Sequence, residues 1–344
     1  GRVDGGYRSS DGRRLPAPTG LCHWVATLRE MTQSTFLDLV QQSLSAETAA
    51  EFAQRIETQA DRLREAIDEG DLDSPAFGIG MELELYAVED DATLTRLPTP
   101  VFEADCEKEL GLHNAELNTS PDRLTDAGIE SQAEKLRASV ASTRAAASDA
   151  GCEVVLDAMW SVPPAEGTDA YLGDVDREDG VLIANNMAHS PRYSAIDTAI
   201  LDECGGSVSV SVPGAAVSVP TILVESLTSS IQPHLQIPDT ATFPDAYNAA
   251  IATLGPVLAL ATNSPLLPVD CYDTDDPEAV LDATHHELRI DVFEKSINGA
   301  WEKVRFPDKL DAPTDVVDLL VEDPTVAPFL REWLADGPRE TFAD

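Results

Sequence analysis

The sequence predicts an α+β fold in which helices flank an antiparallel or mixed sheet. Residues 78–88 alternate apolar and polar side chains at period two, which is typical of a half-exposed strand. Residues 34–69 and 123–150 instead repeat apolar side chains at helical spacing. Strands and helices do not alternate regularly along the chain, and this order favours an α+β fold.

The first half of the chain begins with helical spacing over 34–69, where Ser45 indicates a second helix start and Gly70 a helix end. A strand is predicted at 78–88, entered through a Gly-Ile-Gly turn, and a short strand at 113–118. The alanine-rich segment 123–150 is predicted to be a helix that ends at Gly151.

The second half mixes shorter elements. The segment "CEVVLDAM" is predicted to be a buried strand, and 161–206 to be loops around one helix at 192–203. Strands are expected in "SVSVSVPGAAVSVP", "VESLTSSIQPHLQIP" and "HHELRIDVFE". Helices are expected at 243–262, bent at Gly255-Pro256, and after 311.

The charge of the chain excludes several classes of partner. Among 344 residues there are 62 Asp and Glu against 23 Lys and Arg, a net charge of -39. Such a surface repels nucleic acid and anionic lipid, so neither is an expected partner. Self-repulsion on this scale is relieved in a salt-rich cytoplasm, where the screening length falls to roughly 3 Å at about 1 M salt. The composition therefore indicates a halophilic source.

The five cysteines are scattered and lack CxxC spacing, which favours reduced thiols in a cytoplasm over a disulfide framework or zinc site. No apolar run approaches the ~20 residues of a membrane span. Residues 1–30 differ from the rest in composition and are predicted to be disordered or a non-native extension. Residues 31–344 are predicted to form one catalytic domain.

Polar side chains recur at period two on four of the predicted strands. Alternation places each set on one strand face: Glu82 with Glu84; Glu116 with Asn118; Gln232, His234 and Gln236; and Glu287, Arg289 and Asp291. A solvated sheet face would explain the acidic residues alone. It does not explain an imidazole, amides and a guanidinium at matched positions. Carboxylates with a histidine suit a divalent cation and phosphate, and an arginine can bind a phosphoryl or carboxylate oxygen through two N–H groups. Because no phosphate-binding glycine loop is present, a nucleotide would be held through metal ions and sheet side chains.

Six motifs in order resemble the glutamate–cysteine ligase type 2 family, which are carboxylate–amine ligases with a glutamine-synthetase-like catalytic sheet. They are "GMELEL", "HNAELNTSPDRL", "MAHSPRYSAID", "IQPHLQI", "LALATNSPLL" and "HELRIDVFE", and they span about 77 to 310. The resemblance implies a curved, mainly antiparallel sheet that forms a catalytic funnel flanked by helices. It also implies that ATP joins the γ-carboxylate of glutamate to the amine of cysteine through a γ-glutamyl phosphate.

The resemblance also assigns roles to particular residues. It implies that Mg²⁺ or Mn²⁺ is held by Glu82, Glu84, Glu116, His234 and Glu287. Arg289 would steady the transferring phosphoryl group, with Glu287 beside it. Arg192 would receive a substrate carboxylate or phosphate, unless it forms only a surface salt bridge. Gln232 and Gln236 would bind an amino-acid substrate or pair within the sheet.

The histidine strand departs from the family pattern. Members of the family usually have His-x-His-x-Gly, whereas this chain has Gln232 and Gln236 at the outer two positions and keeps only His234. Two alternatives therefore stay open: a ligase with another amine acceptor, and a homologue that binds metal or nucleotide without catalysis. The sequence leaves homo-oligomerisation open as well.

Overall fold

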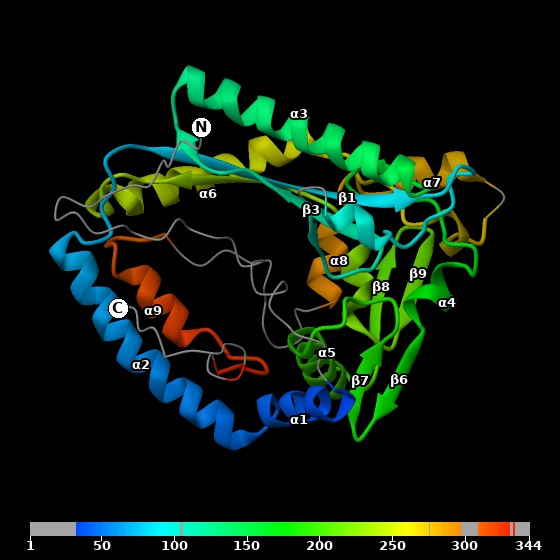
Figure 1. The fold of residues 1–344 in the computed structure, drawn as a ribbon, viewed down its shortest axis with the longest axis horizontal. Coiled ribbons are helices and arrows are strands. Elements are labelled where there is room, and N and C mark those ends of the chain that lie inside the picture. The colour runs from blue at the N-terminus through cyan, green and yellow to red at the C-terminus, as the bar shows by residue number, and fades with distance from the viewer. Residues whose placement is uncertain (1–31, 104–105, 275, 297–308, 331–332, 334–344) are drawn as a thin grey trace.

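The structure is a computed structural model that describes residues 32–103, 106–274, 276–296, 309–330 and 333. The predictions for residues 1–30 and for the start of the catalytic domain at 31 lie outside these residues. Within them, helices flank antiparallel sheets (Figure 1), so the α+β prediction is confirmed. No helix in this part of the chain is long and apolar enough to cross a membrane.

The main sheet has six strands. They are β1 (Gly78–Val88), β2 (Glu107–Lys108), β3 (Asn114–Asn118), β4 (Asp122–Arg123), β5 (Glu153–Val155) and β10 (Ile231–Gln236). Four of them follow the order β10-β1-β3-β2, while β4 and β5 pair with the two ends of β1. Every pairing is antiparallel. The long strand β1 is therefore the central strand of the sheet, and every other strand except β2 pairs with it directly.

The other described elements complete the fold. The α-helices are α1 (Gln33–Ser43), α2 (Ala46–Glu69), α3 (Asp126–Asp149), α4 (Thr168–Leu172), α5 (Pro191–Glu203), α6 (Phe243–Ala261), α7 (Pro277–Ala283), α8 (Leu288–Ser296) and α9 (Asp315–Glu322). The 3-10 helices are η2 (Thr99–Glu103), η3 (Ile222–Leu227), η4 (Thr240–Thr242) and η5 (Val269–Cys271). Two further hairpins pair β6 (Val175–Glu178) with β7 (Val181–Ala184) and β8 (Val208–Val212) with β9 (Ala215–Val219).

Helix ends follow local signals in the sequence. The side chains of Ser45 and Thr125 accept hydrogen bonds from backbone N–H groups in the first turns of α2 and α3. Gly70 closes α2 in the left-handed conformation, with φ of 73°. Of these signals, the sequence analysis used Ser45 and Gly70, and both lie at the ends of α2 as expected.

The hairpin β6–β7 was missed, because residues 161–206 were expected to be loops around one helix. Its strands are joined by Asp179 and Gly180, which both have positive φ. An Asp-Gly pair between strand-like segments is a strong hairpin signal, so the sequence did contain the evidence.

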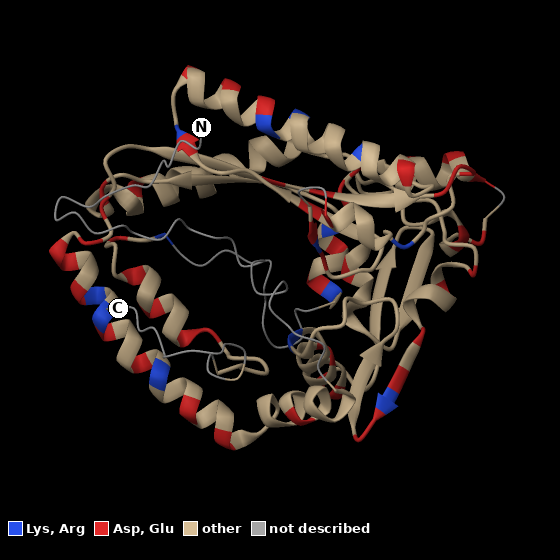
Figure 2. Cartoon of the chain, in the orientation of Figure 1, with Lys and Arg blue, Asp and Glu red and all other residues tan. Residues whose placement is uncertain are grey.

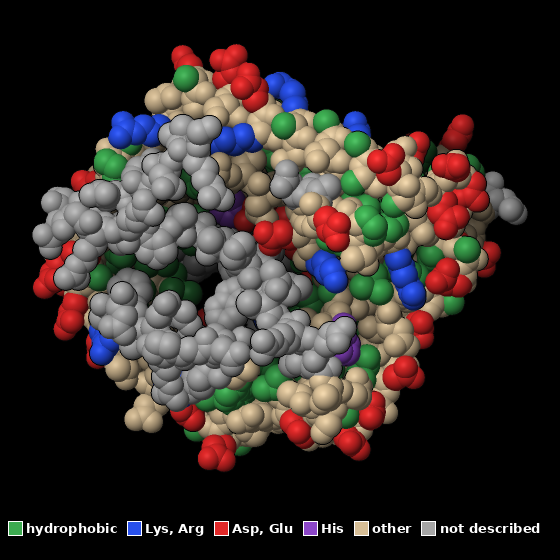
Figure 3. All heavy atoms as spheres, viewed as in Figure 1, with side chains coloured by type: hydrophobic (Ala, Val, Ile, Leu, Met, Phe, Trp, Pro, Cys, Tyr) green, Lys and Arg blue, Asp and Glu red, His purple; other side chains and the backbone are tan. Residues whose placement is uncertain are grey.

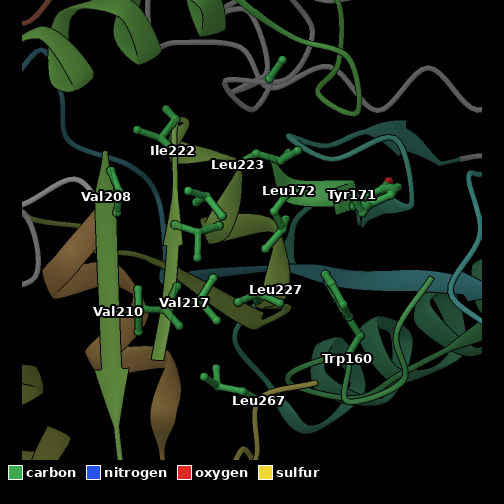
Figure 4. Close-up of a cluster of buried hydrophobic side chains, with 14 of the residues drawn as sticks. Trp160, Tyr171, Leu172, Val208, Val210, Val217, Ile222, Leu223, Leu227 and Leu267 are labelled. Carbon is green, nitrogen blue, oxygen red and sulfur yellow. The ribbon is translucent and has the colours of Figure 1, made fainter. Parts of the chain in front are cut away.

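Two apolar clusters hold the sheet in place. Behind β1, Leu85, Leu117 and Ala147 belong to a cluster that packs α3 against the sheet. A larger cluster beyond the end of the sheet is built around Trp160 and Leu223, with contributions from β8 and β9 (Figure 4). Trp160 is fully buried in this cluster.

One predicted strand is a helix. The segment "HHELRIDVFE" contributes one isolated bridge at Glu287 and then forms α8. Its residues alternate at period two, but Leu288, Val292 and Ser296 also recur at four-residue spacing, and all three are buried. Packing of that face against β8 and η3 decides between the two periodicities in favour of the helix.

Candidate active site

The register of the main sheet places the predicted polar side chains in rows on one face. Glu84 of β1 lies opposite Glu116 of β3, which in turn lies opposite Glu107 of β2. Next to this row, Glu82 of β1 lies opposite Asn118. Directly opposite residues in antiparallel strands share a face, so strands far apart in the sequence bring their carboxylates together.

The other side of β1 extends the same face to β10. Gln232 lies opposite Glu82, and His234 lies opposite Gly80. Because Gly80 has no side chain, the imidazole of His234 reaches along the strand and its Nε2 lies 3.0 Å from Oε2 of Glu82. His234 is more than half exposed. The predicted convergence of β1, β3 and β10 on one polar face is therefore what the structure has.

Three carboxylates converge in the centre of this face. Oxygen atoms of Glu84, Glu109 and Glu116 all lie within 4.8 Å of one another. Glu116 is 2% exposed, and it accepts a hydrogen bond of 2.8 Å from Nδ2 of Asn118. We call these three residues the carboxylate trio.

Burial and mutual repulsion raise the pKa values of two members of the trio, Glu84 and Glu109. Burial, followed by the charges of Glu84, Glu116 and Glu82, raises the pKa of Glu109 from 4.5 to about 7. Burial is also the main cause of the raised pKa of Glu84, to which Glu116 adds. Three carboxylates this close, one of them buried and two half-buried, favour either a proton or a cation among them.

Glu84 is anchored by three hydrogen bonds. Its carboxylate accepts hydrogen bonds from the backbone N–H of Ser230 at 2.9 Å, from the Ser230 hydroxyl at 3.0 Å and from Nε2 of Gln232 at 2.9 Å. These donors favour the ionised form and oppose the effect of burial. Gln232 of β10 therefore orients the Glu84 carboxylate of the neighbouring strand β1.

Glu109 was missed by the sequence analysis. It follows β2, and its Oε2 accepts a hydrogen bond from the backbone N–H of Leu110 at 2.8 Å. A signal existed, because Glu107 and Glu109 flank Lys108 at period two, as on the other polar strands. Nothing local, however, indicates that this two-residue strand pairs with β3.

The predicted pair of Glu287 and Arg289 forms a two-pronged ion pair beside the sheet. Nε and Nη2 of Arg289 donate to the two carboxylate oxygens of Glu287 at 2.6 and 2.8 Å. Glu287 also accepts a hydrogen bond from the Ser264 hydroxyl. Burial opposes ionisation of Glu287, but Arg289 and Ser264 outweigh it and lower its pKa.

The ion pair is tied to the trio through one short stretch of chain. Nη1 of Arg289 donates to the backbone oxygen of Ser229 at 2.9 Å, and the next residue, Ser230, holds Glu84. Nη2 of Arg289 also donates to Oδ1 of Asn263 at 3.2 Å. With the Glu287 bonds, four of the five guanidinium N–H groups are engaged within the described part of the chain.

The remaining predicted residues lie apart from the trio. Arg192 is exposed at the start of α5, and Gln236 is exposed at the end of β10 opposite Gly78. Their binding of substrate stays a prediction, as does metal ligation by the predicted residues Glu82, Glu84, Glu116, His234 and Glu287.

Comparison with known proteins identifies the family. The model of glutamate–cysteine ligase family 2 matches residues 78–332, well over half of the chain. The chain belongs to glutamate–cysteine ligase family 2. No curated protein and no solved structure gives a significant match. The match begins at the first residue of β1 and includes the trio, Glu287 and Arg289.

Members of glutamate–cysteine ligase family 2 are ATP-dependent carboxylate–amine ligases, and such ligases use a divalent metal ion. The trio fits a Mg²⁺ ion in two respects. Its donors are carboxylate oxygens, which Mg²⁺ prefers, and two ligands of one ion about 2.1 Å from the metal lie at most about 4.2 Å apart. Oxygen atoms within 4.8 Å of one another reach that arrangement through small side-chain movements.

Proposed function

We propose that the protein uses ATP to join the γ-carboxylate of glutamate to the amine of cysteine, through a γ-glutamyl phosphate. The observation that carries the proposal is the carboxylate trio, which lies within the residues matched by the model of this ligase family. A carboxylate is a poor electrophile until it is phosphorylated, so the protein must hold ATP and glutamate together in a site that neutralises the phosphates.

Glu84, Glu109 and Glu116 would hold Mg²⁺ or Mn²⁺, with Glu82 and His234 beside them on the same face. The bound metal would neutralise phosphate charge and polarise the transferring phosphoryl group. Without such a cation, an acidic site in a chain of net charge -39 would repel ATP and glutamate. The carboxylates of the site would therefore bind a cation first. The bound cation would then attract the anionic substrates.

Arg289 would orient the site and offer one remaining N–H group to a substrate phosphate. Its bonds to Glu287, Ser229 and Asn263 fix the guanidinium plane before any ligand arrives. A group that is already oriented needs no ordering when charge develops on the phosphoryl oxygens. Arg192 is exposed at the start of α5. It would therefore bind a substrate carboxylate only if the substrate lies against α5.

One observation keeps the two alternatives in view. Gln232 stands where the family usually has its first histidine, and its amide donates to Glu84. An amide that orients a trio carboxylate is compatible with metal binding but supplies no acid or base. The acceptor amine could therefore differ from cysteine, or the chain could bind Mg-ATP without turnover.

The decisive experiment measures ADP release in molar KCl with Mg²⁺, glutamate and a panel of amines. We expect cysteine to support the highest rate and Glu84→Gln or Glu109→Gln to lower it by at least ~100-fold, since metal-site residues contribute several kcal/mol to phosphoryl transfer. Glu153→Gln is the matched control, because Glu153 is an exposed carboxylate on β5 of the same sheet. It should keep the rate of the parent.

Three outcomes separate the alternatives. Release with another amine but not with cysteine would change the acceptor and keep the reaction class. Binding of Mg-ATP by calorimetry, without ADP release for any amine, would indicate the non-catalytic homologue. Equal rates for the parent and for both trio variants would reject the trio as the metal site.

A further inference from the structure

One peptide unit lies between an arginine and a carboxylate of the candidate active site. It consists of the carbonyl of Ser229 and the N–H of Ser230. The carbonyl oxygen accepts a hydrogen bond from Nη1 of Arg289 at 2.9 Å. The N–H of the same unit donates to Oε2 of Glu84, also at 2.9 Å. A guanidinium and a carboxylate are therefore bonded to opposite ends of a single amide, and we call this arrangement the peptide link.

The peptide link replaces one bond of the sheet. The backbone N–H of Glu84 donates to the backbone oxygen of Ser230 at 2.9 Å, as in an ordinary antiparallel pair. The return bond from Ser230 goes to the side chain of Glu84, and the paired register of β1 and β10 ends at the neighbouring pair, Leu83 and Ile231. A backbone donor that would continue the sheet is thus directed at a carboxylate of the trio.

Both ends of the peptide link are fixed by other contacts. The backbone N–H of Ser229 donates to the backbone oxygen of Ala158 at 2.8 Å, and Ser229 is 2% exposed. Nε and Nη2 of Arg289 are bonded to Glu287, so the guanidinium plane is set and Nη1 is directed at Ser229. The link is therefore in place before any ligand arrives.

The acidity of the chain gives such a link a purpose. There are 23 Lys and Arg against 62 Asp and Glu, and Figures 2 and 3 show this excess of acidic residues along the chain and on one face. In molar salt the screening length is roughly 3 Å, so distant exposed charges act only weakly on the trio. Salt ions cannot enter a buried hydrogen-bonded path. The cation of Arg289 can therefore act on Glu84 through the amide even at high salt.

We propose that the peptide link transmits the charge of Arg289 to the Glu84 carboxylate, and that Ser230 is a positioning residue for the cation site. Donation by Arg289 polarises the amide, because hydrogen bonds in a chain strengthen one another by roughly 10–30% per bond. The Ser230 N–H becomes a stronger donor and fixes the direction of Glu84. The Ser230 hydroxyl adds a second bond to Glu84 at 3.0 Å. Because the proposed function places a cation at the trio, the positioning role rests on that function.

The amide signal of Ser230 tests the peptide link without metal. We expect ¹H–¹⁵N spectra of ¹⁵N-serine-labelled protein, in molar KCl with a chelator, to show this signal at low field, because its proton is bonded to a carboxylate. Ser230→Ala removes the signal and so assigns it. Glu287→Gln combined with Arg289→Met removes the arginine charge without leaving a buried carboxylate unpaired. It should move the Ser230 signal upfield by more than the signal of Ser211, which is exposed on β8.

A second variant keeps this test independent of the folding of the first. Glu84→Gln replaces the charged acceptor by a neutral one and leaves Arg289 paired with Glu287. It should also move the Ser230 signal upfield, because a neutral acceptor forms the weaker hydrogen bond.

Manganese binding tests the positioning role. The EPR signal of free Mn²⁺ measures the affinity, and we expect Ser230→Ala to raise the dissociation constant about 10-fold, since groups that hold a metal ligand contribute about 10–100-fold to affinity. Ser230→Thr keeps the hydroxyl and should restore most of the affinity. Ser211→Ala is the matched control and should bind Mn²⁺ as the parent does. Equal melting temperatures of these variants would exclude a general loss of structure.

Each result decides one part of the inference. A Ser230 signal that stays in place in both the paired variant and Glu84→Gln would overturn the peptide link. Equal Mn²⁺ affinities of the parent and Ser230→Ala would overturn the positioning role. A parent that binds no Mn²⁺ would contradict the proposed function and the positioning role with it, whereas the metal-free Ser230 signal would still decide the peptide link.

Discussion

The substitution Glu109→Gln tests the electrostatics of the trio directly. The raised pKa of Glu109, from 4.5 to about 7, means that the unfolded chain loses this proton before the folded protein does. Stability therefore falls as pH rises from 4.5 to about 7 and stays lower above it. At 1.36 kcal/mol per pKa unit, the full cost is about 3 kcal/mol. It is an upper value, because Glu84 and Glu116 share the repulsion.

Glutamine cannot ionise, so the variant should lack this fall. In molar KCl with a chelator, we expect Glu109→Gln to be more stable than the parent at alkaline pH, by up to about 3 kcal/mol, and the gain to shrink toward pH 4.5. Urea unfolding followed by tryptophan fluorescence measures the difference. Mg²⁺ should then stabilise the parent and stabilise the variant less, since binding to the folded state adds a free energy that grows with the logarithm of the affinity.

The control variant and one outcome for Glu109→Gln decide whether this reasoning about the trio is wrong. The exposed Glu153→Gln should show neither the gain at alkaline pH nor the loss of the Mg²⁺ effect. If Glu109→Gln is as stable as the parent or less stable at alkaline pH without metal, then Glu109 does not carry a buried, repelled charge. In that case the argument for a cation site at the trio fails with it.

Three further predictions follow from the described contacts. Burial raises the pKa of Asp197 to about 7, so parent stability should fall between pH 4 and 7, and Asp197→Asn should flatten that profile in urea titrations at several pH values. Arg289→Met should cost about 3–5 kcal/mol of unfolding free energy by leaving the Glu287 carboxylate buried and unpaired, and adding Glu287→Gln should recover part of it in a double-mutant cycle. Gly128→Ala should lower the melting temperature, because the added Cβ would lie 1.8 Å from a backbone oxygen. Gly255→Ala, whose Cβ would lie in open space, should raise the melting temperature through a gain of about 0.8–1 kcal/mol in the free energy of unfolding.

Much of the fold could be predicted because its signals are local. The helix cap predicted at Ser45 depends on a side chain reaching a backbone N–H three residues away. The faces of β1 follow from the fixed alternation of a strand, so the shared side of Glu82 and Glu84 was known before any partner strand. Local geometry of this kind needs no information about distant parts of the chain.

The late segment shows where local information fails. Residues 288–296 satisfy both a strand and a helix pattern, and the burial of Leu288 and Val292 against β8 selects the helix. The predicted approach of Glu287 to Arg289 survives this change, because the end of an extended segment and the first turn of a helix both allow a contact two residues apart.

The sequence by itself determined which side chains share a strand face, and with them the class of chemistry that the face supports. Only the tertiary structure decided which carboxylates meet: Glu109 joined Glu84 and Glu116, while Glu287 turned to Arg289. The reason is that alternation along a strand is set by bonds between neighbours. The register between strands and the burial that raises the pKa of Glu109 depend instead on hydrogen bonds and packing across the whole sheet.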